Sequence, residues 1–182
     1  TAGCAHTHKS YPLPGGAARG ASDSKKPALQ GGWEQLCSNV MAGLSGLNMV
    51  YEAAGMHASL LGFCLESLIL SDDIIGQALR CVRGIEVTDE TLALDQIAQV
   101  CMGGPGHYLG EDQTLKRMQS DYVYPTLGDR TSPKEWVELG KPNLLEKATK
   151  RKEEILSERS EAIFDHQLDI SLRKKHKIHL PI

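Results

Sequence analysis

The sequence of 182 residues predicts an α/β chain in which helix dominates. Within residues 13–55, a glycine-rich loop precedes an apolar helical face, a short apolar run and a second loop, which is the repeating unit of a parallel α/β architecture. After residue 71, apolar residues recur at helical spacing. Because one strand beside many helices must pack against something further, the chain is either a helical domain with a lone strand or part of a larger barrel.

The first predicted element is a glycine-rich loop, LPGGAARGASDSKKP, at residues 13–27. Two of its glycines have the spacing of a phosphate-binding loop, but Ala21 stands where that motif needs a lysine, so the stretch predicts no nucleotide site. Glycine permits positive φ and lets a ligand approach the backbone closely. Arg19 and Asp23 either contact such a ligand or pair with each other to hold the loop.

A helix is predicted to follow, beginning at Pro27 with Ser24 or Lys26 as its cap. Its apolar residues recur on one helical face, and we expect Trp33 on that face to join the core. The apolar positions are Leu29, Trp33, Leu36, Cys37, Val40, Met41 and Leu44.

Residues 47–51 are short, apolar and bounded by turn residues, as a buried parallel strand is. Tyr51 and Glu52 stand at the end of this strand, where α/β proteins favour functional groups. Glu52 also opens the loop that runs to Gly55. His57, just after this glycine, is interpreted first as a hydrogen-bonded structural histidine and second as a site residue.

The rest of the chain is predicted to be helical. The apolar run ASLLGFCLESLIL is too short to span a bilayer. Glu66 interrupts this run, and because a buried unpaired carboxylate is costly, we expect it to be paired or to lie at a helix surface. The loop MGGPGHYLG carries His107 and Tyr108, which serve either as a lid or as a plain turn between helices. Helices are predicted from Asp72 to Gly84, from a Thr88 cap through Val100, from Asp112 to Tyr122, from Ser132–Pro133 onward, and from Asn143 to Glu158.

Composition sets limits on function. A net charge of −3 with 41% hydrophobic residues gives no bias toward nucleic acid, and no membrane contact is expected. Five widely spaced cysteines, an odd number, favour a reducing cytoplasm. The beginning at Thr1, without Met or an apolar leader, gives no indication of secretion. His6 and His8 lack further ligands nearby, so no metal site is predicted.

Four motifs follow one another along the chain: SDSKKPALQGGWE, AAGM, DDIIGQALRCVRGIEVTDETLALDQI and GGPGHYLGEDQTLKRM. Through them the chain, from about Leu13 to its basic end, resembles the C-terminal part of the trimethylamine methyltransferase family. It departs from the family's frequent pattern at His57–Ala58, where Leu-Glu is common, and at Glu111–Gln113, where His-Pro-His is common. These departures leave the substrate open.

The resemblance implies the C-terminal segment of a TIM-like (β/α)8 barrel with several extra C-terminal helices. Residues 1–60 would be the closing βα units, residues 61–160 a C-terminal helical region, and residues 161–182 a basic tail that is either solvated or an arm between subunits. The N-terminal barrel half would then be a partner absent from this chain, with which the start at Thr1 agrees.

The resemblance further implies transfer of a methyl group from trimethylamine or a betaine-like quaternary amine to the Co(I) of a corrinoid (cobalamin) on a separate corrinoid protein. No cofactor would be held permanently, because the corrinoid-carrying motif D-x-H-x-x-G does not occur in the chain. The catalytic residue stays unknown, since the position where pyrrolysine falls in the founding members would precede Thr1.

Under barrel geometry, the substrate-binding candidates lie on loops that follow strands. Tyr51, Glu52 and Tyr108 suit a quaternary ammonium, which has no N–H to donate and is recognised by aromatic faces and carboxylates. Arg19 suits a substrate carboxylate. The candidate set also contains Asp23, His57 and His107. A reading of another class is a non-catalytic helical module for docking or oligomerisation, and a homo-oligomer is expected under either reading.

Overall fold

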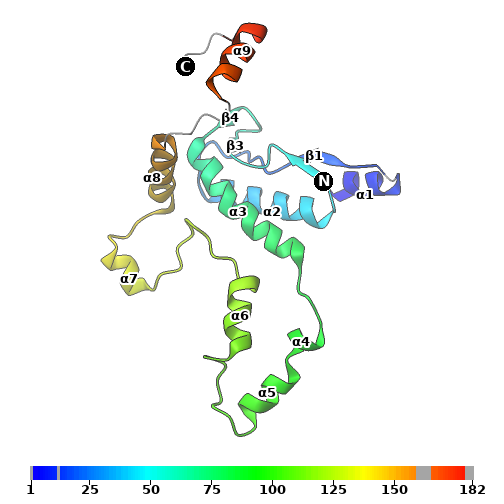
Figure 1. Cartoon of the computed structure of the whole chain (residues 1–182), viewed down its shortest axis with the longest axis vertical. Helices are drawn as coiled ribbons and strands as arrows, with labels where there is room; N and C mark the ends of the chain where they lie inside the picture. Colours follow the sequence, from blue (N-terminus) through cyan, green and yellow to red (C-terminus); the bar gives the residue numbers. More distant parts are fainter. Residues whose placement is uncertain (1, 12, 159–164, 179–182) are drawn as a thin grey trace.

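The computed structural model describes residues 2–11, 13–158 and 165–178. Within them the chain forms α1 (Ala2–Ser10), β1 (Gly16–Ala18), α2 (Leu29–Leu44), β2 (Met49–Tyr51), β3 (Met56–His57), β4 (Gly62–Phe63), α3 (Leu65–Arg83), α4 (Asp89–Leu92), α5 (Leu94–Cys101), α6 (Asp112–Asp121), α7 (Pro133–Glu138), α8 (Leu144–Ser157) and α9 (His166–His176) (Figure 1). The fold is therefore rich in helix, as predicted.

The first strand and helix form a parallel βαβ unit. β1 pairs with β2 so that Gly16 lies opposite Met49 and Ala18 opposite Tyr51, with α2 as the connection between the two strands. The prediction of a parallel strand ending at Tyr51 is confirmed, but the strand begins at Met49 and not at residue 47, and it is not buried, because Met49 and Tyr51 are exposed. The prediction of an uninterrupted loop at residues 13–27 is wrong, because Gly16–Ala18 form a strand. Glycine and alanine are uncommon in strands, so the sequence Gly-Ala-Ala did not indicate one.

The start of α2 also differs from the prediction. The helix begins at Leu29 after Ala28 in an extended conformation, and the described residues supply no side-chain cap there. The Ser24 hydroxyl instead donates to the carbonyl of Lys26 at 2.7 Å, within the turn that leads into the helix. Ser24 therefore stabilises the approach to α2 and does not cap it.

The predicted core face of α2 is wrong as well. Its buried side carries Gly31, Gln35, Asn39 and Ala42, while Trp33 is 58% exposed and Leu29 is 79% exposed. This small and polar side packs on α3, whose buried residues are Ser67, Ser71 and Ala78. Helices with small residues in contact approach closely, and the apolar side of α2 is left without a covering layer in the described chain.

A buried polar network joins α2 to α3. Ser71 on α3 donates its hydroxyl to Gln35 on α2 at 3.1 Å and accepts the backbone N–H of Gly55 at 3.2 Å. Asn39 donates to the carbonyl of Ala53 at 3.3 Å. Because buried polar groups are costly to leave unpaired, these bonds determine how the loop after β2 lies on the two helices.

α3 is longer than predicted. It begins at Leu65, seven residues before the predicted start at Asp72, because Glu66 lies in its first turn and Ser67 and Ser71 supply its buried side. A short hairpin of β3 and β4, which the sequence did not predict, leads into it. Glu66 is paired, as expected, with Lys152 of α8 at 2.7 Å, and α8 packs on α3.

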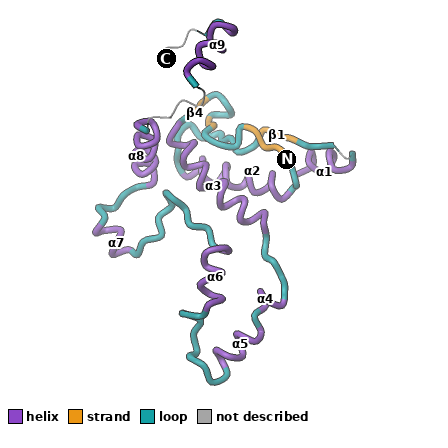
Figure 2. The backbone as a smooth tube through the Cα atoms, in the orientation of Figure 1, coloured by secondary structure: helices purple, strands orange, loops and turns teal. Residues whose placement is uncertain are grey.

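Residues 84–122 form a segment that we call the arm, and residues 16–83 form what we call the body. The arm contains α4, α5 and α6 and projects away from the body (Figure 1). Figure 2 shows that the strands gather in the body, while the arm consists of helices and loops. The predicted helix from the Thr88 cap through Val100 is interrupted at Ala93, which has φ 52°.

The remaining helices follow the sequence closely. α6, α7 and α8 lie where they were predicted, and Ser132 and Asn143 cap α7 and α8 in reciprocal capping boxes. Of the predicted basic tail at residues 161–182, the part from His166 to His176 forms α9, while residues 161–164 and 179–182 fall outside the described residues. None of the helices in the described ranges is both long and apolar enough to cross a membrane.

Candidate functional site

Three of the candidate side chains lie at the C-terminal ends of the two parallel strands. Arg19 directly follows β1, and Tyr51 and Glu52 end and follow β2. The backbone N–H of Arg19 donates to the carbonyl of Tyr51 at 3.0 Å, so the pairing of the strands continues into this position. The βαβ connection thus brings together residues that are more than thirty positions apart in sequence.

Tyr51 lies on the uncovered face of this sheet. Successive strand residues point to opposite faces, and in β2 the half-buried Val50 stands between Met49, which is 65% exposed, and Tyr51, which is 48% exposed. A side chain built on Gly16 would contact the Tyr51 ring at 3.8 Å, so the ring lies over β1. The aromatic face is therefore available to a ligand on this side of the sheet.

Glu52 has an uncommon backbone conformation. Its φ of 60° places a non-glycine residue in the left-handed region, at a cost of about 1 kcal/mol or more. Its side chain is exposed, and no hydrogen bond or ion pair involves its carboxylate in the described part of the chain. The position directly after Tyr51 thus holds an exposed carboxylate without a partner among the described residues.

The loop after β1 is locked against the loop after β2. Gly20 has φ 101°, and a Cβ at this position would lie 2.3 Å from the carbonyl oxygen of Ala53. The backbone N–H of Gly20 donates to Ser38 of α2 at 2.8 Å, and that of Ser22 donates to the carbonyl of Met56 at 3.1 Å. The segment around Arg19 is therefore held by both α2 and the neighbouring loop.

Glu34 of α2 holds the same loop by its carboxylate. Its Oε2 atom accepts the Ser22 hydroxyl at 2.6 Å and the backbone N–H of Asp23 at 2.9 Å, while Oε1 accepts Gln30 at 2.9 Å. These bonds, led by the one from Ser22, lower the pKa of Glu34. Sequence reasoning missed Glu34 and Ser38, because their partners lie twelve and eighteen residues away and no local pattern marks them.

Asp23 and Arg19 do not hold each other. Asp23 accepts the Ser59 hydroxyl at 2.5 Å through Oδ1, and among the described residues no ion pair joins it to Arg19. The Nε atom of Arg19 is buried, and the residues that the structure describes offer it no hydrogen-bond partner. Of the two predicted alternatives, mutual pairing is therefore wrong, and Asp23 ties its loop to the β3–β4 turn.

His57 points away from the strand ends. It is 5% exposed, and its Nε2 atom forms a 2.5 Å hydrogen bond with the Ser67 hydroxyl of α3. The structure thus agrees with its interpretation as a hydrogen-bonded structural histidine. It also lines a pocket of about 540 Å³ between α2, α3 and α8, which the sequence did not reveal; Trp33, Leu36, Leu70 and Leu144 line it too.

His107 and Tyr108 lie in the loop between α5 and α6, at the far end of the arm from the sheet (Figure 1). Both are exposed. The Tyr108 hydroxyl lies 3.4 Å from Cys101 Sγ, and this contact raises the pKa of the tyrosine. The structure places Arg19, Tyr51 and Glu52 next to one another along the backbone at the strand ends. His57, His107 and Tyr108 lie outside that group.

Within the described ranges, no cluster of three or more His, Cys, Asp or Glu side chains has the arrangement of a metal site. What the strand ends offer is an aromatic face, an unpaired carboxylate and a guanidinium. These are the group types that bind cationic or zwitterionic small molecules by charge and ring contact.

Comparison with known proteins identifies the family of the chain. Residues 1–177 match the profile of a family described as trimethylamine methyltransferase (MTTB). The chain is 29% identical to a glycine betaine methyltransferase of Desulfitobacterium hafniense over 90% of its own length and 33% of the relative's. It is 34% identical to a trimethylamine methyltransferase of Methanosarcina barkeri over 80% of its length and 29% of the relative's.

A trimethylamine methyltransferase of Methanosarcina mazei is 35% identical over 80% of the chain. The chain spans about a third of the length of these curated relatives. With a family profile matched along nearly all of its residues, the chain belongs to the trimethylamine methyltransferase family.

Proposed function

We propose that the whole protein carrying these residues transfers a methyl group from trimethylamine or a betaine-like quaternary amine to the Co(I) of a corrinoid on a separate protein. Membership of the methyltransferase family supports methyl transfer in general. The observation that carries the proposal is the grouping of Arg19, Tyr51 and Glu52 at the C-terminal ends of adjacent parallel strands, the place where α/β proteins bind ligands.

We propose further that β1, α2 and β2 are closing units of a (β/α)8 barrel. The parallel pairing with a helical connection is the repeating unit of such a barrel. The exposed side of β2 would face the barrel interior, and the exposed Trp33 and Leu29 of α2 would be covered by neighbouring elements. The remaining strands would be supplied by the N-terminal barrel half, in keeping with the span of a third of the relatives' length.

In the proposed reaction the C–N bond breaks, the amine leaves with the bonding pair, and the methyl group bonds to cobalt. The corrinoid supplies the nucleophile. The chain's own residues bind and orient the amine: the Tyr51 ring and the Glu52 carboxylate contact the ammonium, and Arg19 holds a substrate carboxylate. No general base is needed, because the step depends on alignment and on exclusion of water.

A second candidate function is favoured by a different observation. Large apolar side chains are exposed along the arm, among them Ile85 at 86% and Met102 at 83%. Such surfaces are typical of docking or oligomerisation, so a non-catalytic docking module and a homo-oligomer remain part of the proposal. A cytoplasmic location is proposed with them, supported by the free thiols of Cys37, Cys64, Cys81 and Cys101.

The first experiment measures methyl transfer by the whole protein from trimethylamine, glycine betaine and related betaines to Co(I) cobalamin, followed by absorbance. Formation of methylcobalamin from one amine establishes the activity and names the substrate. No transfer from any of them under strictly reducing conditions, with the native corrinoid protein added, removes the enzymatic proposal. A chain that is monomeric and folded alone would then favour the docking module.

Two variants test the residues. Glu52→Gln removes the negative charge beside the ammonium and is expected to weaken binding of every amine in the panel by roughly tenfold. Arg19→Ala is expected to weaken betaine binding selectively, because trimethylamine has no carboxylate for the guanidinium. Unchanged affinity in Glu52→Gln removes Glu52 from the site, and equal losses for both substrate types in Arg19→Ala remove the carboxylate role of Arg19.

A further inference from the structure

We propose that Glu34 of α2 is a positioning residue for Arg19: its carboxylate holds the loop after β1 so that the guanidinium faces a carboxylate-bearing substrate. The inference rests on the proposed function. It concerns a residue that contacts no substrate itself, and it follows from the bonds that α2 makes to the loop.

The loop that begins with Arg19 is tied to one side of α2. Ser38 accepts the backbone N–H of Gly20, and Glu34, one helical turn earlier, accepts both the Ser22 hydroxyl and the backbone N–H of Asp23. These anchors cover the residues directly after Arg19. Because Ser22 is only 2% exposed, its hydroxyl has no ready replacement partner in water if Glu34 is lost.

A carboxylate is suited to this position because one oxygen receives two donors at once. Hydrogen bonds to an ionised acceptor are shorter and stronger than those to a neutral one, and the Ser22 bond is 2.6 Å long. The Ser22 hydroxyl also accepts the backbone N–H of Ser24 at 2.9 Å, so the donor to Glu34 is itself aligned. The loop is thereby held in one conformation by a chain of bonds.

Arg19 depends on this arrangement more than its neighbours do. Its backbone N–H is paired to the carbonyl of Tyr51, and its buried Nε atom has no hydrogen-bond partner among the described residues. No side-chain hydrogen bond within the described chain therefore fixes the guanidinium, whose position rests on the loop backbone and on packing. Tyr51 ends β2 and Glu52 directly follows it, and neither residue bonds to Glu34. Loss of Glu34 should therefore affect recognition of the substrate carboxylate and leave ammonium recognition in place.

The test compares Glu34→Ala, Glu34→Gln and Asp73→Asn in the whole protein. Asp73 is the matched control, since it is a carboxylate on α3 that holds a different loop through bonds to Thr126, Leu127 and Gly128. Glu34→Ala is expected to raise KM for glycine betaine roughly tenfold with little change in kcat, and to leave KM for trimethylamine within about twofold. Glu34→Gln keeps an oxygen acceptor and should fall between wild type and Glu34→Ala.

Asp73→Asn should leave the ratio of the two KM values unchanged. Where only one amine is turned over, the other is measured as a competitive inhibitor. Equal losses for both amines, a ratio matched by Asp73→Asn, or no change in Glu34→Ala would each overturn the positioning role. A wild type that binds glycine betaine but transfers no methyl group overturns the proposed function alone. The role of Glu34 is then still tested by the ratio of the affinities for glycine betaine and trimethylamine. A wild type that binds neither amine overturns both.

Discussion

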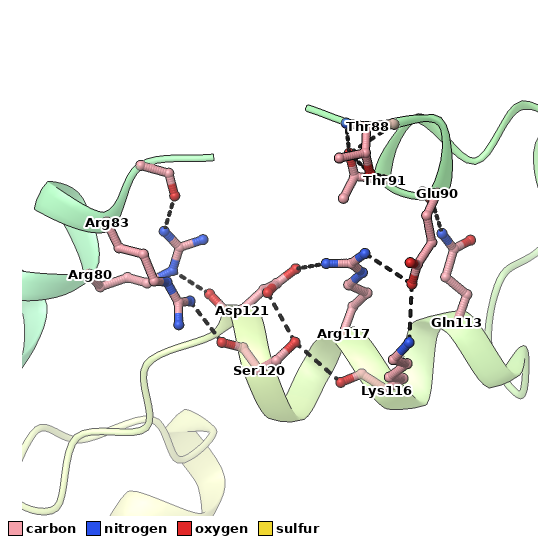
Figure 3. A network of polar contacts seen from close by, with 11 residues as sticks. Arg80, Arg83, Thr88, Glu90, Thr91, Gln113, Lys116, Arg117, Ser120 and Asp121 are labelled. Carbon is pink, nitrogen blue, oxygen red and sulfur yellow. Dashed lines mark hydrogen bonds and ion pairs between the residues drawn. The ribbon is translucent and has the colours of Figure 1, made fainter. Parts of the chain in front are cut away.

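The body and the arm of this chain are held together in different ways. In the body, Ser71 is fully buried and Gln35 is 3% exposed. The Ser71 hydroxyl donates to Gln35 and accepts the backbone N–H of Gly55, which joins α2, α3 and the loop after β2. In the arm, the Glu90 carboxylate forms ion pairs with Lys116 and Arg117 at 3.1 and 3.2 Å (Figure 3). The side chains of Glu90 and Lys116 are largely exposed. Water can replace the second kind of contact and not the first.

The junction between the two regions is also polar. Arg80 and Arg83, in the last turn of α3, donate to the carbonyls of Asp121 and Ser120 at 2.6 and 2.7 Å, at the end of α6 (Figure 3). Cations near a helix C-terminus are favourable, so this junction is stabilising although it is partly exposed. The candidate site lies wholly in the body, where its backbone is held by buried groups. We expect the arm to tolerate changes that the body does not.

The largest difference between the regions is expected at two glycines with the same φ of 101°, Gly20 in the body and Gly103 in the arm. Gly20→Ala places a Cβ 2.3 Å from the Ala53 carbonyl oxygen, whereas a Cβ on Gly103 has nothing within 4 Å. Gly20→Ala should cost about 3 kcal/mol or more of unfolding free energy, and Gly103→Ala about 1 kcal/mol. Urea unfolding measures both, and equal losses would mean that the two loops do not differ in constraint.

The next largest effect is expected at Asp73, which fastens the segment that returns from the arm to α3. Its Oδ1 atom accepts Thr126, and Oδ2 accepts the backbone N–H groups of Leu127 and Gly128 at 2.8 and 3.0 Å. These bonds lower its pKa against the opposing effect of desolvation, which is the largest single influence. In Asp73→Asn, the amide N–H₂ replaces one of the two carboxylate oxygens. It either faces the backbone N–H donors of Leu127 and Gly128 or takes the place of the acceptor for Thr126.

We expect Asp73→Asn to lower the unfolding free energy by about 1.5 kcal/mol. The neighbouring Asp72→Asn is the control, because Asp72 is exposed and forms no hydrogen bond or ion pair in the described part of the chain. Thermal unfolding of both variants checks this, and a loss in Asp72→Asn equal to that in Asp73→Asn would show that general charge, and not the bonds to residues 126–128, is responsible.

Local signals in the sequence predicted the helices α6, α7 and α8 and the cap at Thr88, although the predicted helix after Thr88 is interrupted at Ala93. The caps at Thr88, Ser132 and Asn143 lie next to the helices that they begin, so the pattern contains the whole cause. The structure of the body was harder to predict from the sequence. The strand Gly16–Ala18 has no β-branched residue, and the burial of α2 was inverted, because periodicity identifies an apolar face but not the layer that covers it.

The candidate site divides in the same way. Tyr51 and Glu52 could be predicted because they end a recognisable strand, and the structure places them beside Arg19. Glu34 and Ser38 could not, since their importance arises from contacts with a loop that precedes the helix. The residues proposed to bind are marked in the sequence by their type and place, whereas the residue proposed to position Arg19 is marked only by its contacts in the folded structure.

A smaller effect is expected at the contact between Glu66 and Lys152. The hydrogen bond from Lys152, helped by Cys64, lowers the pKa of Glu66 from an ordinary value of 4.5 to about 2. A lowered pKa means that the stabilisation is fully present above pH 4.5 and is lost as the pH falls toward 2. Glu66→Gln should therefore be less stable than wild type at neutral pH, and the difference should shrink in this window.

Thermal unfolding of wild type and Glu66→Gln between neutral pH and the acid range measures this, with the exposed Glu153→Gln of the same region as control. A difference in melting temperature that is independent of pH would contradict the role of the ionised pair in joining α8 to α3.

The smallest effect is expected in the arm, at Glu90. The bond from Lys116 and the nearby charge of Arg117 lower the pKa of Glu90, so the pair is ionised at neutral pH, but the side chains of Lys116 and Glu90 are 72% and 60% exposed. Glu90→Gln should change the melting temperature less than Glu66→Gln does, whose pair is only 22–24% exposed.

Salt sharpens this last comparison. The Debye length falls from about 10 Å at 0.1 M salt to about 3 Å at 1 M, so the effect of Glu90→Gln should vanish at high salt while that of Glu66→Gln persists in part. The capping box of Thr88 and Thr91 and the bond from Gln113 to the Glu90 carbonyl do not use the carboxylate, so they remain as an internal control. A Glu90→Gln effect that resists salt would mean that the arm is held as firmly as the body, and the contrast between the two regions would fail.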